Sequence, residues 1–328
     1  MLELKHVSVE FASENNVLAV DDISMRLPEH SRTAIVGETG SGKSVLLLAI
    51  LRLLPSNARV QGSVLLNGEE VLKADGKRMC EIRGGEISYI PQGGGASMNP
   101  LIKVGNQVGE PLREHRGYSR KKAFAAGVEL LRRFNLLQEE RLAKAYPHTF
   151  SGGMRQRAMV AMGIAAGAQI VLADEPTKGL DERRTALVAE SLKLLETETL
   201  LCVTHDMGFA GKISDNICVM YAAQQVEFGA AEEILKNPLH PYTRDMIAAM
   251  PENGMKYEDA GFAPSHGSYL HCDTGCRYQA RCRERMECCR RTPPLAEVNG
   301  HKVRCWKYVD RDEKTDKEIC KCERSDGS

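Results

Sequence analysis

Short, nearly uniformly apolar runs recur along the first two thirds of the chain, and each ends at a glycine or a polar residue. Residues 34–36 precede a glycine-rich loop, residues 170–173 precede two acidic residues, and residues 200–204 precede a histidine. Such runs are typical of strands buried on both faces, as in a parallel sheet. We therefore expect an α/β fold in which these polar residues follow the carboxyl ends of strands, where open sheets bind ligands.

The segments around these strands show other periodicities. Residues 1–31 alternate between apolar and polar positions, which predicts antiparallel strands with a turn at Asp21-Asp22. Residues 45–54 are predicted to form a helix after the glycine-rich loop. Residues 101–146 are charged and periodic at helical spacing, so they are predicted to form a helical insert.

The last third of the chain is predicted to contain two edge strands, at residues 216–221 and 225–229. Pro241 is expected to end one element before a helix over residues 242–250. Turn-forming residues then gather in a linker, and a polar tail closes the chain. The predicted division is an α/β domain at 1–250 with its helical insert at about 101–150, a linker at 251–270, a cysteine-rich segment at 271–310 and a disordered tail at 311–328.

The glycine-rich loop has the sequence GETGSGKS, which is a phosphate-binding motif. Its glycines let the backbone N–H groups point at the phosphates, Lys43 adds a positive charge, and Ser44 supplies a hydroxyl for Mg²⁺. The strand before it and the helix after it are the context that a chance match would lack. We therefore expect ATP to be bound by Gly37, Glu38, Thr39, Gly40, Ser41, Gly42, Lys43, Ser44 and Val45.

Three residues at the ends of the other two strands complete a predicted site for ATP hydrolysis. Asp174 is placed to hold the Mg²⁺ shell, and Glu175 can polarise the water that attacks the γ-phosphate. The imidazole of His205 can sense or stabilise that phosphate. A single histidine after a strand is more often structural, but the neighbouring motifs favour a catalytic role here.

Composition limits the classes of partner. The 328 residues include 44 basic and 44 acidic side chains, so the chain has no net field that would attract nucleic acid. No stretch reaches the roughly 18 apolar residues of a membrane span, and the start MLELKHVSVE is predicted to be a strand rather than a signal peptide. We expect a soluble protein that needs other chains to act across a membrane.

These motifs together resemble the ATP-binding subunits of ABC transporters, and the resemblance covers nearly the whole chain. Ser151, Gly152 and Gly153 resemble the family's signature motif, with Phe150 where leucine is commoner. In that family two ATPase domains dimerise head to tail, so that each ATP lies between one phosphate loop and the other subunit's signature motif. The resemblance implies a P-loop ABC-type ATPase domain, with an antiparallel β subdomain and a helical subdomain, that pairs with a second, homologous ATPase subunit.

The same resemblance implies roles for three more residues. Gln92, in the sequence YIPQ, would contact Mg²⁺ and the attacking water and couple the site to membrane subunits, although Gly93–Gly95 replace the usual acidic or bulky continuation. Asp181 resembles the aspartate that reaches across the dimer. Phe11 lies where the family places an aromatic ring against adenine, and an ordinary core position in a strand is an equally good interpretation.

The segment ILKNPLHPYTRDMIAAMP resembles the tail that dipeptide, oligopeptide and nickel importer ATPases share. It implies import of di- or oligopeptides, with two transmembrane permease subunits, an external substrate-binding protein, and a location at the cytoplasmic face of the cell membrane. Nickel or another chelated metal is the alternative cargo. A soluble ABC-type ATPase is an alternative of another class, although such proteins often carry two ATPase units or a long coiled-coil insertion. His240 is interpreted as a packing or turn residue.

Eight of the eleven cysteines lie from Cys272 onward, and four of them form a candidate thiolate set: Cys276, Cys282, Cys289 and Cys305. Disulfides are disfavoured, because a protein that uses Mg-ATP works in the reducing cytosol. Four thiolates suit zinc, but zinc sites favour cysteines two to four residues apart, and the longer spacings here suit a cluster at least as well.

A further resemblance favours a cluster over zinc. The sequence GCRYQARC, with Cys289 and a following PPL, resembles a C-terminal motif of dipeptide importer ATPases that can hold a [4Fe–4S] cluster. This implies a [4Fe–4S] cluster on the four cysteines, with zinc as the alternative ion and Cys288 as a possible substitute for Cys289.

Overall fold

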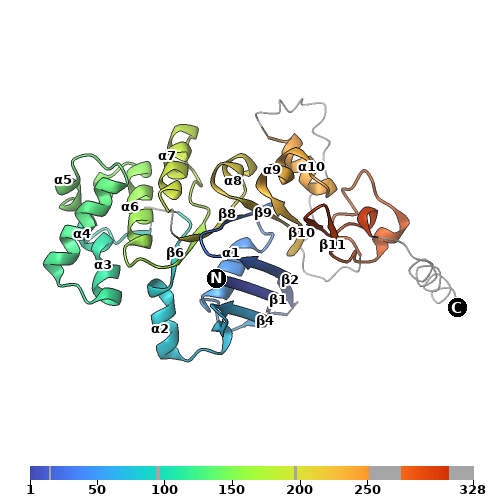
Figure 1. Cartoon of the computed structure of the whole chain (residues 1–328), viewed down its shortest axis with the longest axis horizontal. Helices are drawn as coiled ribbons and strands as arrows, with labels where there is room; N and C mark the ends of the chain where they lie inside the picture. Colours follow the sequence, from blue (N-terminus) through green and yellow to red (C-terminus); the bar gives the residue numbers. More distant parts are fainter. Residues whose placement is uncertain (15, 94–96, 196–197, 251–274, 310–328) are drawn as a thin grey trace.

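The structure is a computed structural model, and it describes residues 1–14, 16–93, 97–195, 198–250 and 275–309. These residues form an elongated body, with helices at one end, a sheet in the middle and the C-terminal segment at the other end (Figure 1). Within the described residues, no helix is both long and apolar enough to cross a lipid bilayer. The expected linker at 251–270 and tail at 311–328 lie outside the described residues.

A large mixed sheet organises the fold. Its main path runs in the order β5-β4-β1-β2-β10-β9-β3-β8-β7-β6, and a hairpin of β11 and β12 joins it because β12 pairs with β10. The strands are β1 (Leu2–Phe11), β2 (Val17–Leu27), β3 (Arg32–Val36), β4 (Ala58–Leu66), β5 (Glu69–Glu70), β6 (Ile87–Ile90), β7 (Ile170–Asp174), β8 (Thr199–Thr204), β9 (Asn216–Tyr221), β10 (Gln224–Ala230), β11 (Ala296–Val298) and β12 (His301–Val303).

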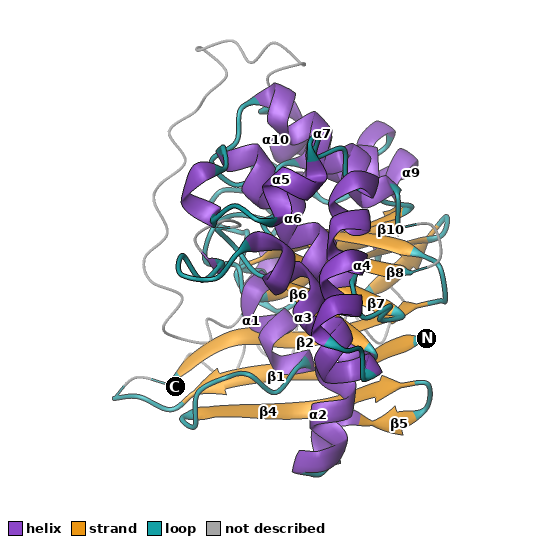
Figure 2. Cartoon of the chain, turned by 90° about the vertical axis from the view of Figure 1, so that its left-hand side faces the viewer, coloured by secondary structure: helices purple, strands orange, loops and turns teal. Residues whose placement is uncertain are grey.

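The antiparallel part comprises β5, β4, β1 and β2, which lie together in Figure 2 below the parallel strands β7 and β8. The predicted turn at Asp21-Asp22 is wrong, because both residues lie inside β2. Asp22 has a left-handed backbone, with φ of 53°, at an irregular stretch of the β1–β2 register. Its N–H donates to the hydroxyl of Ser8 at 2.9 Å, so a turn-forming residue is accommodated as a bulge.

Parallel strands β9, β3, β8, β7 and β6 form the other half of the sheet. The prediction of edge strands at residues 216–221 and 225–229 is wrong, because β9 pairs with both β3 and β10, and β10 pairs with β9, β2 and β12. Residues 217–221 are buried without alternation, which is the pattern of an interior strand.

Helices cover both faces of this sheet and build a separate helical group. Besides short 3₁₀ turns, they are α1 (Lys43–Ile50), α2 (Gly76–Gly85), α3 (Val104–Arg116), α4 (Arg120–Arg133), α5 (Glu139–Ala143), α6 (Gly152–Ile164), α7 (Glu182–Lys193), α8 (Met207–Ile213), α9 (Ala231–Lys236) and α10 (Pro241–Ala248).

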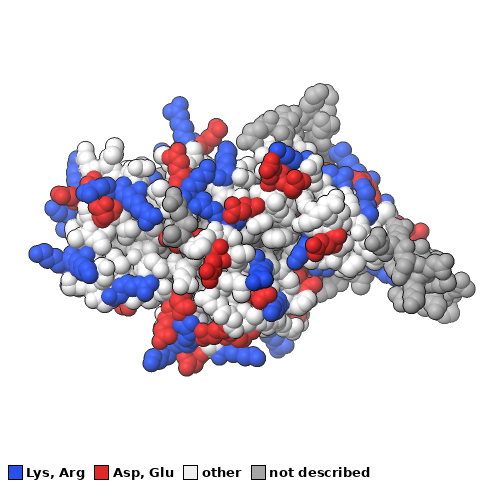
Figure 3. Space-filling view, in the orientation of Figure 1, with Lys and Arg blue, Asp and Glu red and all other residues white. Residues whose placement is uncertain are grey.

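The core follows from this arrangement of helices on the sheet. One face of β3, carrying Ile35, packs in a cluster with Leu46 and Leu47 of α1, and the other face packs under α8 and α9. A further cluster joins the predicted helical insert, through residues such as Phe134, to α6 and α7. Figure 3 shows that basic and acidic side chains are interspersed over the visible surface of the body.

The described part of the cysteine-rich segment, residues 275–309, packs against the main sheet rather than standing apart from it. In β12, Val303 pairs with Glu227 of β10. Tyr278 lies against Tyr221 and Tyr242, with ring centroids 5.1 and 5.4 Å away. The segment is therefore held by a sheet edge and an aromatic cluster.

A buried carboxylate connects this segment to the main domain. Glu227 is 0% exposed, and it accepts hydrogen bonds from the N–H groups of Leu239 and His240 at 2.8 and 3.0 Å and from the ring of His301 at 3.2 Å. His240 caps α10, where its ring accepts from the N–H of Tyr242, and burial lowers the pKa of His240 to about 3. This turn role agrees with the interpretation of His240 from the sequence.

Candidate functional site

The predicted phosphate loop connects β3 to α1 and packs closely against the sheet. A side chain at Gly37 would place a Cβ 2.1 Å from the carbonyl oxygen of Met220, and one at Gly42 would lie 2.0 Å from that of Ala19. Gly42 also has a φ of 94°, in the left-handed region. These contacts explain why glycine is needed at both positions.

The ammonium group of Lys43 lies within the loop. It donates to the carbonyl oxygens of Gly37 and Glu38 at 2.7 and 2.9 Å. Burial lowers the pKa of Lys43, and the carboxylates of Glu175 and Asp174 oppose this effect. The cation is therefore fixed where the loop, the acidic pair and a bound phosphate would meet.

The three residues predicted to hold Mg²⁺, Ser44, Asp174 and Gln92, come from separate elements. The hydroxyl of Ser44 donates to Oδ1 of Asp174 at 2.7 Å, which joins the start of α1 to the end of β7. A hydroxyl and a carboxylate are the hard oxygen ligands that Mg²⁺ prefers, so this pair fits the ion. Gln92 is exposed just after β6, the strand that pairs with β7, and residues 94–96, which include most of the glycine run, lie outside the described residues.

Sequence reasoning missed one residue of this group. Tyr89 of β6 donates its hydroxyl to Oδ2 of Asp174 at 3.1 Å. Burial raises the pKa of Tyr89, and the charge of Asp174 raises it further, so the hydroxyl stays protonated as a donor. The signal that could have found it is its place in a strand beside the acidic pair, just before Gln92.

Glu175 and His205 lie side by side at the ends of β7 and β8. Nδ1 of His205 is 2.6 Å from Oε2 of Glu175, whose side chain is 9% exposed while that of His205 is 54% exposed. Glu175 has a φ of 46°, a conformation that costs a non-glycine residue of the order of 1 kcal/mol or more and is concentrated at functional sites. This left-handed backbone follows the end of β7 at Asp174, and the carboxylate of Glu175 lies beside the ring of His205.

The signature residues and Asp181 occupy the first turns of two neighbouring helices. Ser151 is the N-cap of α6 and accepts from the N–H of Met154, and Asp181 is the N-cap of α7 and accepts from the N–H of Arg184. The side chain of Arg184 lies over Gly152 and Gly153. The signature residues and Asp181, both predicted to take part in the dimer interface, therefore lie next to each other within one chain.

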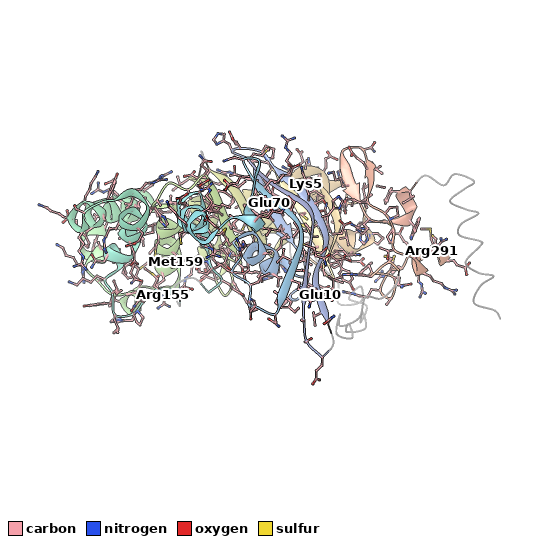
Figure 4. All side chains as sticks on the ribbon, turned by 90° about the horizontal axis from the view of Figure 1, so that it is seen from below. Lys5, Glu10, Glu70, Arg155, Met159 and Arg291 are labelled. Atoms are coloured by element: carbon pink, nitrogen blue, oxygen red, sulfur yellow. The ribbon has the colours of Figure 1, made fainter. Side chains whose placement is uncertain are left out.

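The signature motif belongs to a different packing unit from the phosphate loop. Helix α6 packs on α3, α4, α7 and β6, whereas α1 packs on β1, β2 and β7. In Figure 4, Arg155 and Met159 of α6 lie toward the helical end, away from Arg291 in the C-terminal segment. Phe11, the last residue of β1, is half-buried against the hydrophobic core, so both interpretations of this residue stay open.

The four candidate cysteines gather in the C-terminal segment. Burial raises the pKa of Cys276 to about 12, and the nearby thiols of Cys289, Cys305 and Cys282 raise it further, because a second thiolate would oppose its charge. The N–H of Cys276 donates to the carbonyl oxygen of Cys289 at 2.8 Å. Cys288 is also buried, in an apolar cluster with Cys289 and Trp306. Across the described residues, however, no three His, Cys, Asp or Glu side chains are arranged to hold a single metal ion.

The C-terminal elements also touch the phosphate loop, which sequence reasoning did not foresee. The N–H of Glu38 donates to the hydroxyl of Tyr242 at 3.0 Å, and the carboxylate of Glu38 pairs with the guanidinium of Arg281 at 2.7 Å. The partners are separated by 204 and 243 positions, so no local pattern could have indicated the contacts.

Comparisons with known proteins agree with this geometry. A family model described as ABC transporter matches residues 20–178, and one described as the C-terminal region of oligopeptide/dipeptide transporters matches residues 226–289. The chain is 36% identical over 312 residues to the oligopeptide transport ATP-binding protein OppD of Haemophilus influenzae, covering 93% of this chain and 97% of the relative. It is 37% identical over 324 residues to a putative peptide import ATP-binding protein of Brucella melitensis, covering 92% and 95%.

A solved structure shares the cassette fold. The ATP-binding cassette MJ0796, described in a dimeric post-hydrolysis state bound to ADP and Pi, superposes with a TM-score of 0.62 and 26% identity, and the match covers 70% of this chain and 99% of that one. The predicted ABC-type ATPase fold is thereby confirmed. Both the fold and the sequence matches assign the chain to the family of ABC transporter ATP-binding proteins, in the branch that carries the oligopeptide/dipeptide transporter C-terminal region.

Proposed function

We propose that this protein is the ATP-hydrolysing subunit that energises import of di- or oligopeptides through an ABC transporter in the cell membrane. The observation that carries the proposal is the 36% identity to an oligopeptide transport ATP-binding protein over 93% of the chain. The relatives described above are named for oligopeptide or peptide transport, which favours peptides over nickel or another chelated metal. The match to the C-terminal region favours a transporter subunit over a soluble ABC-type ATPase.

The proposed mechanism assigns each residue of the site a task in phosphoryl transfer. The N–H groups of the phosphate loop and the ammonium group of Lys43 hold the β- and γ-phosphates. Ser44, Asp174 and Gln92 would hold Mg²⁺, and the bound ion would supply positive charge that offsets the charge of the phosphates. Glu175 accepts a proton from the attacking water, and His205 orients this carboxylate through their contact of 2.6 Å.

Dimerisation completes the site in this proposal. Ser151, Gly152 and Gly153 close over the phosphates bound to a second, homologous ATPase subunit, and Asp181 reaches across the same interface. Closure and reopening are passed through the region of Gln92 to two transmembrane permease subunits at the cytoplasmic face of the membrane. An external substrate-binding protein delivers the peptide.

Purification of the intact complex tests this function. The tagged chain, extracted in mild detergent from its own cells, is expected to bring two very hydrophobic proteins and a second ATPase, identified by mass spectrometry. ATP hydrolysis by that complex in proteoliposomes should rise when the external binding protein is loaded with peptide, and stay at the basal rate when it is loaded with nickel. Recovery with ribosomes or soluble partners alone, or stimulation by nickel and not by peptide, would contradict the proposal.

We propose further that Cys276, Cys282, Cys289 and Cys305 hold a [4Fe–4S] cluster. A zinc ion needs four sulfurs at about 2.3 Å from one centre, whereas a cubane cluster binds each cysteine at a different iron and so spaces the sulfurs more widely. The cluster is favoured here by the spacing of the four cysteines along the chain, which is longer than the two to four residues typical of paired zinc ligands. Burial raises the pKa of Cys276, Cys282 and Cys305, and binding to iron would keep these thiols deprotonated.

Metal analysis of two cysteine variants tests the cluster. The protein purified anaerobically is expected to contain about four irons and four sulfides per chain and to absorb visible light. Cys276→Ser should lose most of the iron, whereas Cys80→Ser, at an exposed position in α2, should keep it. One zinc per chain, or iron that is unaffected by Cys276→Ser, would refute the assignment.

A further inference from the structure

The C-terminal segment reaches the phosphate loop through one arginine. Arg281 lies between Tyr278 and Cys282, and its guanidinium pairs with Oε1 of Glu38 at 2.7 Å. The two side chains are 19% and 36% exposed, so the pair is partly shielded from water. Glu38 is the second residue of the loop, immediately before the residues whose N–H groups are expected to face the phosphates.

Aromatic rings hold this arginine in place. The guanidinium carbon of Arg281 lies 5.6 Å from the ring centroid of Tyr278 and 5.9 Å from that of Tyr221, at cation–π distances. Tyr221 ends β9, directly after Met220, whose carbonyl oxygen packs against Gly37. The side chain of Arg281 therefore reaches the phosphate loop beside the end of β9, against which the loop also packs.

A second contact fixes the backbone at the same residue. The hydroxyl of Tyr242, from the start of α10, accepts the N–H of Glu38 at 3.0 Å. Tyr242 is 1% exposed and its ring centroid lies 4.5 Å from that of Tyr221. Glu38 is thus anchored by its N–H and by its carboxylate, from two elements that follow it by more than 200 positions.

The segment that carries Arg281 is itself anchored independently. Arg277, four residues earlier in the chain, pairs with Asp21 of β2 at 2.5 Å and also donates to the carbonyl oxygen of Ala222. Arg281 is therefore not a flexible surface side chain that meets Glu38 by chance. Its Cα is fixed by neighbours that would remain if the contact with Glu38 were removed.

We infer that Arg281, with Tyr242, positions the phosphate loop, so that the C-terminal segment sets the affinity of the site for ATP. Neither residue is a catalytic residue, because the contacts run through Glu38. Fixing Glu38 before ATP arrives reduces the ordering that binding must supply, and pre-organisation of this kind is expressed as affinity. This inference rests on the assignment of the loop as an ATP site but is independent of the cargo.

Nucleotide titration of the full chain tests the inference. Arg281→Ala is expected to raise the dissociation constant for a fluorescent Mg-ATP analogue by about three- to tenfold, because one charge-assisted contact is lost. Arg281→Lys should recover part of the affinity. Arg283→Ala removes an exposed arginine two positions away and is expected to change the constant by less than about twofold.

A double-mutant cycle with Glu38→Gln separates positioning from general destabilisation. If Arg281 acts through Glu38, the combined variant should bind ATP no more weakly than the weaker single variant. In the assembled transporter, Arg281→Ala should raise KM for ATP while kcat changes less. Additive effects, or a folded Arg281→Ala protein with unchanged affinity, would overturn the inference.

Two other outcomes are a variant that does not fold and a control variant that loses affinity. Should Arg281→Ala fail to fold, Arg281→Lys and Glu38→Gln carry the test, and unchanged affinity in both would also overturn the inference. An equal loss for Arg283→Ala would overturn it as well. Because ATP affinity is measured without cargo, a failure here is distinct from failure of peptide import, which the proteoliposome assay reports.

Discussion

Glu175→Gln is expected to reduce ATP hydrolysis by about 10²- to 10⁴-fold while Mg-ATP still binds. The amide keeps the size of the side chain and can still contact His205, which lies 2.6 Å away, but it cannot accept a proton from the attacking water. Binding is carried by the phosphate loop and by Asp174, which the substitution leaves in place. The measurement is steady-state hydrolysis by the purified complex, with nucleotide affinity measured on the same preparation.

Glu190→Gln provides the matched control for this prediction. Glu190 is an exposed glutamate near the end of α7, and its substitution should leave hydrolysis within about twofold of the unmodified protein. Hydrolysis by Glu175→Gln at near the unmodified rate would refute the role of Glu175. A parallel loss of nucleotide binding would instead place Glu175 in binding rather than catalysis.

Glu227→Ala is expected to lower the free energy of unfolding by about 3 kcal/mol or more, since it leaves several buried donors without an acceptor. The side chain is 0% exposed and accepts from two backbone N–H groups and from His301. Because these donors belong to the start of α10 and to β12, the C-terminal segment should also become more accessible to protease. Urea unfolding at neutral pH measures the first effect, and limited proteolysis measures the second.

Two variants make the Glu227 prediction specific. Glu227→Gln keeps one acceptor oxygen and should cost less than the alanine variant. Glu297→Ala changes an exposed residue of β11 in the same hairpin and should alter stability by less than about 0.5 kcal/mol. Equal urea midpoints for Glu227→Ala and Glu297→Ala would show that the buried carboxylate does not hold the segment.

The features that could be predicted from the sequence are those whose physical cause is local. The phosphate loop depends on glycines beside a strand and a helix, and the acidic pair depends on a buried run that ends at Asp174, so short patterns indicate both. The turn predicted at Asp21-Asp22 failed because β1 supplies partners to Asp22 that a sequence does not reveal.

Long-range contacts account for the rest of what was missed. The interior position of β9 and β10 depends on pairing with strands far away in the sequence. Tyr89 matters because β6 lies next to β7, and Arg281 matters because a distant segment packs beside the phosphate loop. Each of these residues has an unremarkable local sequence, so only the folded chain identifies it.

The contact between Arg281 and Glu38 also bears on how the protein is made. The two residues are 243 positions apart, so a ribosome that adds about 5 to 20 residues per second synthesises Arg281 roughly 12 to 50 s after Glu38. During that interval the nascent chain has a phosphate loop without its arginine. The nucleotide site of a newly synthesised subunit therefore gains this contact only after residue 281 has been added, and a chain released before that point lacks this support for the loop.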